Sequence, residues 1–147
     1  PIREGVIVSK QSWAFLGVGL LLGAGFTSLR AADAPPPAPV FEIRTYHTLP
    51  GRLDALNKRF REHTMRVFEK HGMTNVAYWT FEDSPAKENT LIYVISHKSR
   101  DAAKASWAAF IADPEWQKIA ADSQKDGKII ERIESVFVDA TDYSPLK

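Results

Sequence analysis

Four segments of the chain have the pattern of hydrophobic and polar positions that is typical of β-strands. Residues 41–47 alternate strictly, which places successive side chains on opposite faces of a sheet. Residues 74–82, 91–97 and 129–138 are rich in β-branched and aromatic residues, and turn-forming residues lie between the segments. We therefore predict a strand in each of the four.

Three further segments have the spacing of amphipathic helices. In residues 52–71 apolar side chains recur every three or four positions and form one continuous stripe. Two more helices are predicted over residues 100–112 and 114–126. Ser99 precedes the first of these and Asp113 the second, and both residue types commonly cap a helix N-terminus.

The order of these elements is strand, helix, strand, strand, two helices and strand. It matches the ferredoxin-like split βαβ arrangement, an α+β fold with a four-stranded antiparallel sheet and the helices on one face. The strands predicted over residues 74–82 and 91–97 carry large apolar side chains on both faces, although the helices cover only one. We predict that a second copy of the chain covers the other face, giving a homodimer with its sheets packed face to face.

The segment before these elements has the features of a secretory signal peptide. Its apolar, glycine-rich run at residues 13–26 would make a helix of about 21 Å, which is short for a bilayer core of about 30 Å. Ala32-Asp33-Ala34 then matches the small-x-small pattern of a cleavage site. We interpret residues 1–34 as the signal peptide of an exported, periplasmic or extracytoplasmic protein. The alternative is an uncleaved segment that tethers the protein to a membrane.

One domain accounts for the rest of the chain. We expect a proline-rich linker at residues 35–39, the domain at 40–143 and a C-terminal tail at 144–147. Residues 35–147 carry equal numbers of basic and acidic side chains, which gives no electrostatic reason to expect a nucleic-acid partner. The sequence has no cysteine, so disulfides, thiol nucleophiles and thiolate metal sites are excluded.

Six short motifs follow one another along the predicted domain. They are residues 41–46 (FEIRTY), 50–53 (PGRL), 59–64 (RFREHT), 68–73 (FEKHGM), 107–110 (WAAF) and 113–116 (DPEW). With these motifs the chain resembles the NIPSNAP family over about residues 40–143. The resemblance implies a dimeric α/β barrel, in which two ferredoxin-like units close across their sheets. It implies no particular reaction, because related barrels include cofactor-independent mono-oxygenases, haem-degrading enzymes and plain ligand binders.

Two histidines are candidates for a catalytic role. His71 lies near the centre of the apolar stripe, where it could act as a general base or a haem ligand. The simpler interpretation is a charge that stabilises the helix end. His63 lies at the edge of the stripe, where a structural role at the core boundary is the alternative. Because the two are eight residues apart on one predicted helix, they cannot share a metal ion, and we predict no metal site.

Five residues are candidates for contact with a ligand: Arg44, Tyr46, Tyr78, Trp79 and Trp107. Arg44 could clamp a carboxylate-bearing ligand, although an ion pair with Glu42 or Glu134 is the simpler interpretation. In a dimeric barrel we expect the strand face that carries Arg44 to point inward. The aromatic candidates could line an apolar cavity or fill the core.

These features favour an exported NIPSNAP-like barrel that binds a small hydrophobic or carboxylate-bearing molecule. No cofactor is predicted, and membrane contact is expected only through an uncleaved signal segment. One alternative is a cofactor-independent mono-oxygenase or haem-handling enzyme that uses His71 and His63; the other is a protein-interaction module. A cavity that contains one of these histidines would favour the enzyme, and a cavity without convergent titratable groups would favour the binder.

Overall fold

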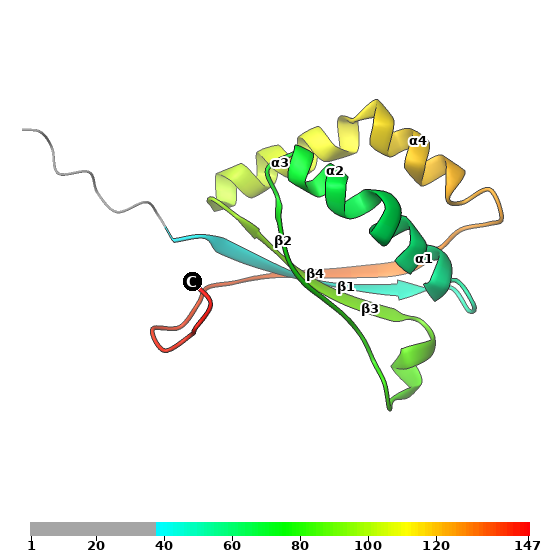
Figure 1. Cartoon of the computed structure of the whole chain (residues 1–147), viewed down its shortest axis with the longest axis horizontal. Helices are drawn as coiled ribbons and strands as arrows, with labels where there is room; N and C mark the ends of the chain where they lie inside the picture. The colour runs from blue at the N-terminus through cyan, green and yellow to red at the C-terminus, as the bar shows by residue number, and fades with distance from the viewer. Residues whose placement is uncertain (1–37) are drawn as a thin grey trace, which may run out of the picture. The chain divides into compact units, whose positions relative to one another are not determined.

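The computed structural model describes residues 38–147 (Figure 1). The predicted signal peptide at residues 1–34 lies outside the described residues, as does most of the predicted linker. The elements in chain order are β1 (Val40–Thr48), α1 (Leu53–Arg59), the π-helical turn η1 (Phe60–Thr64), α2 (Met65–Lys70), β2 (Thr74–Thr80), the 3₁₀ turn η2 (Pro85–Glu88), β3 (Thr90–His97), α3 (Arg100–Ala112), α4 (Pro114–Asp122) and β4 (Ile130–Val138). No helix in this part of the chain is long and apolar enough to cross a membrane.

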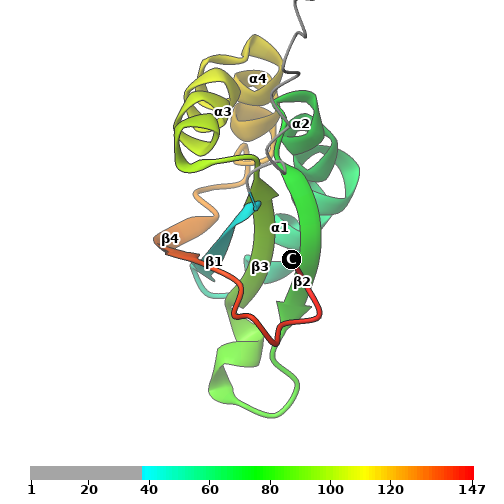
Figure 2. The same cartoon turned by 90° about the vertical axis from the view of Figure 1, so that its left-hand side faces the viewer.

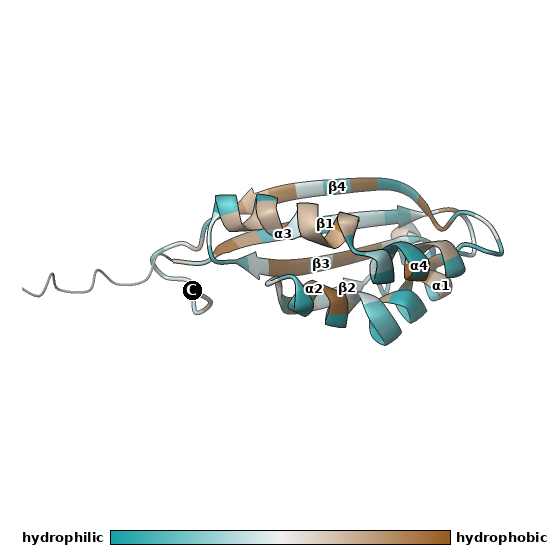
Figure 3. Ribbon diagram, turned by 90° about the horizontal axis from the view of Figure 1, so that it is seen from above, coloured by the Kyte–Doolittle hydropathy of each residue, from teal (hydrophilic) through white to brown (hydrophobic). Residues whose placement is uncertain are grey.

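The strands form one antiparallel sheet in the order β2-β3-β1-β4. Figure 3 looks onto the sheet through the helices and shows that α1 to α4 all cover the same face. The ferredoxin-like prediction is therefore confirmed. The last predicted helix is shorter than expected, since α4 ends at Asp122 and Ser123 is its C-cap. The chain then turns through Gly127, whose φ of 108° is favourable only for glycine.

The first predicted helix is continuous from α1 through η1 to α2, but it contains one π-helical turn. The Thr64 hydroxyl donates a hydrogen bond of 3.2 Å to the carbonyl oxygen of Arg59, five residues earlier. A π turn accommodates an extra residue, and such turns are often found at functional sites. Here it keeps both Phe60 and Thr64 buried against the sheet, so the predicted apolar stripe faces the core along the whole helix.

The core between the helices and the sheet is mostly aromatic. Tyr93 of β3 is fully buried at its centre, and the rings of Tyr46, Phe60, Phe68 and Tyr78 lie 5.1–5.9 Å from it. Most of these contacts are tilted or edge-to-face, while Tyr78 stacks on Tyr93. These rings hold the long helix firmly against β1, β2 and β3.

The strand face that carries Arg44 points towards the helices. Tyr46, two residues along β1, packs on Phe60 of η1, and Arg44 lies over the ring of Trp107 in α3. The expectation that this face is the interior of a barrel is therefore wrong for the folded chain. The helices pack on this face because its tyrosines Tyr46, Tyr78 and Tyr93 contact Phe60 and Phe68 of the long first helix.

The opposite sheet face has no helix over it. Trp79 of β2 and Val136 of β4 are each 54% exposed there. The C-terminal segment turns back over one end of this face (Figure 2). Its residues, together with Phe41, Ile43 and Val94, line a cavity of about 320 Å³ there. The rest of the face is apolar around Trp79 of β2, as the pattern of the sequence predicts for that strand, whereas His47, Arg132 and Glu134 form a charged cluster on it along β1 and β4.

Candidate functional site

A cavity of about 300 Å³ lies between the sheet and the helices. Its walls come from β1, the long first helix, α3, α4 and β4, so the complete fold is needed to form it. The lining residues are predominantly apolar, with two arginines among them: Arg44, Tyr46, Arg59, Phe60, Thr64, Phe68, Trp107, Phe110, Ile111, Trp116, Ala120, Gln124, Ile130 and Ile133. We call this the inner cavity. An aromatic cavity with a few polar groups is typical of a small-molecule site.

Arg44 enters the inner cavity from the sheet, with its charge already paired. Its Nη1 donates to Glu42 Oε1 at 2.6 Å, and its guanidinium carbon lies 4.2 Å from the centre of the Trp107 ring. The ion-pair interpretation of Arg44 is thus confirmed, with Glu42 as the partner. Glu134 instead pairs with Arg132 and lies 3.3 Å from His47.

Glu42 is the centre of a buried hydrogen-bond network. Its Oε1 accepts from Arg44 and from the hydroxyl of Ser135, both at 2.6 Å, and its Oε2 accepts from His97 Nε2 at 3.0 Å and Trp107 Nε1 at 2.7 Å. Burial raises the pKa of Glu42, but these hydrogen bonds outweigh it and hold the pKa at about 2, below the ordinary 4.5. The carboxylate is therefore ionised at neutral pH.

Arg59 enters the inner cavity from the helix side, and its surroundings are different. It is only 4% exposed, and no carboxylate of residues 38–147 lies within ion-pair distance of it. Its Nη1 donates to the hydroxyl of Ser123 at 3.3 Å, and its guanidinium lies 5.4 Å from the Trp116 ring. Its Nε is buried and has no hydrogen-bond partner among the described residues. Burial lowers the pKa of Arg59, yet arginine keeps its proton in proteins. Arg59 is therefore a buried cation with unused donors.

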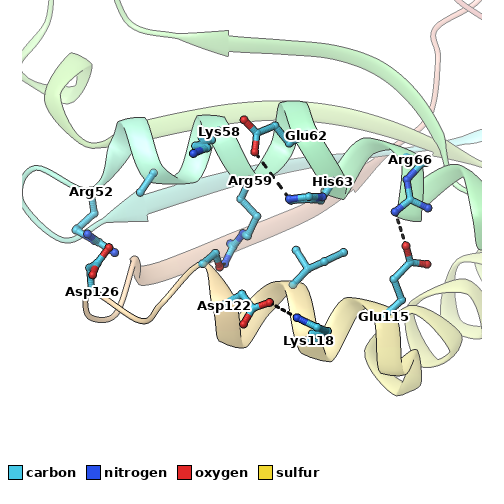
Figure 4. A pocket seen from close by; sticks show the side chains of 13 residues that line it. Arg52, Lys58, Arg59, Glu62, His63, Arg66, Glu115, Lys118, Asp122 and Asp126 are labelled. Carbon is cyan, nitrogen blue, oxygen red and sulfur yellow. Dashed lines mark hydrogen bonds and ion pairs between the residues drawn. The ribbon is translucent and has the colours of Figure 1, made fainter.

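A second, polar depression of about 610 Å³ lies outside Arg59, between the long first helix and α4. We call it the outer groove. Figure 4 shows Arg59 extending across it towards the end of α4, while neighbouring charges pair with one another, Arg66 with Glu115 and Lys118 with Asp122. Arg59 lines both the outer groove and the inner cavity, and so it lies where the two meet.

The structure separates the five predicted ligand residues. Arg44, Tyr46 and Trp107 come together at the inner cavity. Tyr78 lies on the same sheet face but belongs to the aromatic core, stacked on Tyr93. Trp79 follows Tyr78 in the strand and so points to the opposite, open face, 54% exposed. Trp79 therefore does not line the inner cavity with Arg44, Tyr46 and Trp107.

The two candidate histidines lie apart from the inner cavity. His71 is the C-cap of α2, and its Nε2 is 2.7 Å from Asp113 Oδ2 at the junction of α3 and α4. Lys70 and His71 both lower the pKa of Asp113. His63 lies on η1 in the wall of the outer groove, 3.8 Å from Glu62 and partly exposed. Neither histidine lines the inner cavity.

Arg59 was absent from the predicted site residues. One signal in the sequence could have pointed to it. Arg59 lies beside Phe60 at the edge of the apolar stripe, where a charged side chain is expected to be partly buried. That Arg59 has no counter-ion among the described residues could not be predicted from a local pattern. It depends on which side chains α4, more than 50 residues away in the chain, brings next to Arg59.

The family model described as NIPSNAP matches residues 41–145. The chain belongs to the NIPSNAP family. Two solved relatives are NIPSNAP family proteins from Agrobacterium tumefaciens. One, of unknown function, is 26% identical, with a TM-score of 0.64 over 74% of this chain and 94% of its own. The other is 21% identical, with a TM-score of 0.65 over 75% and 100%.

A further relative supports the fold alone. A NIPSNAP-like domain protein from Burkholderia xenovorans is 16% identical, with a TM-score of 0.63 over 73% of this chain and 89% of its own. The comparison with curated proteins found no match. The relatives therefore share the NIPSNAP fold with this chain.

Proposed function

We propose that this NIPSNAP protein binds a small hydrophobic or carboxylate-bearing molecule in the inner cavity. The observation that carries the proposal is Arg59, a cation that is buried without a carboxylate partner at the wall of an aromatic cavity. A buried, unpaired charge is costly to the folded protein. A ligand that supplies the missing acceptor removes that cost, which is a physical reason for the cavity to be occupied.

The size and composition of the inner cavity support the same proposal. Its volume of about 300 Å³ is at the lower end of the ~300–1,000 Å³ typical of small-molecule sites. The rings of Phe110 and Trp116 lie 4.3 Å apart in its wall, and Trp107 lies 5.6 Å from Phe110. Such rings provide apolar contact area and the possibility of stacking on a flat ligand.

The test is to fill the cavity and follow ligand retention. Native mass spectrometry of the protein purified from an exporting host reports any small molecule that co-purifies with it. Ala120 lies in the cavity wall on α4 and Ala121, the next residue, is exposed. We expect Ala120→Leu to lose the ligand and Ala121→Leu, the matched control, to keep it. Equal retention by both variants would contradict the proposal.

The enzyme alternatives receive no support from the geometry. A mono-oxygenase or haem-handling reaction that used His71 or His63 would place one of them at the ligand, and neither lines the inner cavity. His71 is instead committed to Asp113. We therefore propose binding, without a reaction, and place it outside the cytoplasm because of the signal peptide that residues 1–34 predict.

We also propose that a second copy of the chain covers the open sheet face. That face exposes Trp79 and Val136 to water, and a twofold axis would bury the same surface of both copies at once. Size-exclusion chromatography with light scattering is expected to give twice the monomer mass, and Trp79→Asp to give a monomer. Ile111→Asp is the control, because Ile111 is at least as exposed as Trp79 but lies on the helix side. A monomeric wild-type protein at micromolar concentration would exclude this dimer.

A further inference from the structure

The inner cavity carries one uncompensated positive charge. Two arginines line it, but the charge of Arg44 is balanced by Glu42 at 2.6 Å. Four hydrogen bonds keep Glu42 ionised. The remaining charge belongs to Arg59, for which residues 38–147 provide no counter-ion. A ligand with one negative charge would neutralise the cavity.

The outer groove adds no further positive charge for a ligand. Its charged lining residues, His63 aside, are five basic and four acidic side chains: Arg52, Lys58, Arg59, Arg66 and Lys118 against Glu62, Glu115, Asp122 and Asp126. The excess is one positive charge, and Arg59 itself is among the five. A ligand with two negative charges, such as a phosphate ester or a dicarboxylate, would therefore place its second charge among side chains that are already neutralised. Removing that charge from water would then cost free energy without a new ion pair.

The guanidinium of Arg59 has one donor without a partner and one that is only weakly bonded. Its Nε has no partner among the described residues, and the contact from Nη1 to Ser123 is long, at 3.3 Å. The Ser123 hydroxyl already donates to the carbonyl oxygen of Ala120 at 2.9 Å. A carboxylate accepts two parallel hydrogen bonds from one guanidinium, a stronger and more specific contact than a neutral acceptor makes.

The backbone holds Arg59 in this place. Arg59 is the last residue before the π-helical turn η1, and the Thr64 hydroxyl hydrogen-bonds to its carbonyl oxygen. Phe60 and Thr64, at the start and the end of that turn, both line the inner cavity beside Arg59. The turn thus places the cation Arg59 and part of the apolar wall at the same cavity.

We propose that the inner cavity selects monocarboxylic acids with an apolar body, with Arg59 as the residue that binds the carboxylate. The apolar body lies against Trp107, Phe110 and Trp116, and the single charge of Arg59 excludes dicarboxylates of the same size. This inference rests on the proposed function, since it names the chemical class of the ligand for the same cavity.

The experiment compares acids with their neutral and doubly charged analogues by isothermal titration calorimetry on the purified, ligand-stripped protein. The monoacids are benzoate, cinnamate and octanoate. Each is matched with its amide, and terephthalate and suberate serve as the dicarboxylates of benzoate and octanoate. We expect at least one monoacid to bind about tenfold or more tightly than its amide and its dicarboxylate, because a charge-assisted bidentate contact is lost or a second charge is buried.

Arg59→Gln assigns the preference to this residue. The variant keeps a polar side chain in the cavity wall and removes the charge, and we expect it to bind the acid and the amide with equal affinity. Arg61→Gln is the matched control, since Arg61 lies on the same helix but is exposed, and it should keep the wild-type preference. A thermal melt shows whether each variant is folded; if Arg59→Gln is not, the ligand series on the wild-type protein still decides.

The possible outcomes separate the two proposals. A monoacid preference that disappears only in Arg59→Gln supports the inference. Equal binding of acids and amides to the wild-type protein overturns the selection of carboxylates while leaving a binding function in place. Tighter binding of the dicarboxylates overturns the argument from a single charge. If no compound binds and no small molecule co-purifies, both proposals are wrong.

Discussion

Two arginines line the same cavity from opposite sides, and they differ in how the protein satisfies them. On the sheet side, Arg44 is paired with Glu42, whose carboxylate accepts four hydrogen bonds. On the helix side, Arg59 is buried with one long hydrogen bond to Ser123. The first arrangement is complete by itself and stabilises the fold. The second lacks an acceptor, and such incompleteness at a cavity wall is what distinguishes a binding group from a structural one.

The largest effect on stability is expected when the pair of Arg44 and Glu42 is disrupted. Glu42→Gln removes the charge that balances Arg44 and leaves that guanidinium partly buried and unpaired. We expect the free energy of unfolding to fall by about 3 kcal/mol, measured by urea denaturation. Glu131→Gln, an exposed position on β4, is the control and should change little. A loss no larger than that of the control would show that the network is dispensable.

Acid should disrupt the same pair without a mutation, because it protonates Glu42. The pKa of Glu42 is about 2 in the folded protein against an ordinary 4.5, so the unfolded chain binds the proton more tightly and the ionised carboxylate favours the folded state. This stabilisation is complete above about pH 4.5 and is lost as the pH falls towards 2, up to about 3 kcal/mol. Urea unfolding at several pH values should show this loss in the wild-type protein and a smaller one in Glu42→Gln.

Replacing Arg59, the arginine without a counter-ion among the described residues, should change the stability in the opposite direction. Arg59→Met keeps the length of the side chain and removes an uncompensated buried charge, so we expect the free energy of unfolding to rise by about 1 kcal/mol. Binding of monocarboxylates should fall about tenfold or more in the same variant. Arg61→Met should change neither quantity. A clear loss of stability in Arg59→Met would mean that the protein itself satisfies this guanidinium.

The smallest effects are expected at the histidines. His71→Ala removes the contact with Asp113 and should lower the thermal midpoint by a few degrees, with ligand binding unchanged. His63→Ala, at a partly exposed position on the outer groove, should leave the midpoint nearly unchanged. A large loss of ligand affinity in His71→Ala would contradict a purely structural role and indicate that His71 takes part in binding.

The secondary structure was largely predictable because it follows from local patterns. The period of two in residues 41–47 and the helical stripe of residues 52–71 each depend on neighbours within a few positions. Capping by Ser99 and Asp113 was equally local, and both side chains accept the expected backbone hydrogen bonds. The π-helical turn was not predictable, since its extra residue leaves the apolar stripe looking like that of an ordinary helix.

The sequence by itself determined the order of the elements, the α+β class, the NIPSNAP family and the ambiguity between clamp and ion pair at Arg44. Only the tertiary structure decided that Arg44 is paired, that Trp79 faces away from the cavity and that Arg59 has no counter-ion among the described residues. Local patterns record which face a side chain takes. Whether a buried charge is satisfied depends on groups that the fold brings from distant strands and helices, and this information is not contained in the spacing of residues along one element.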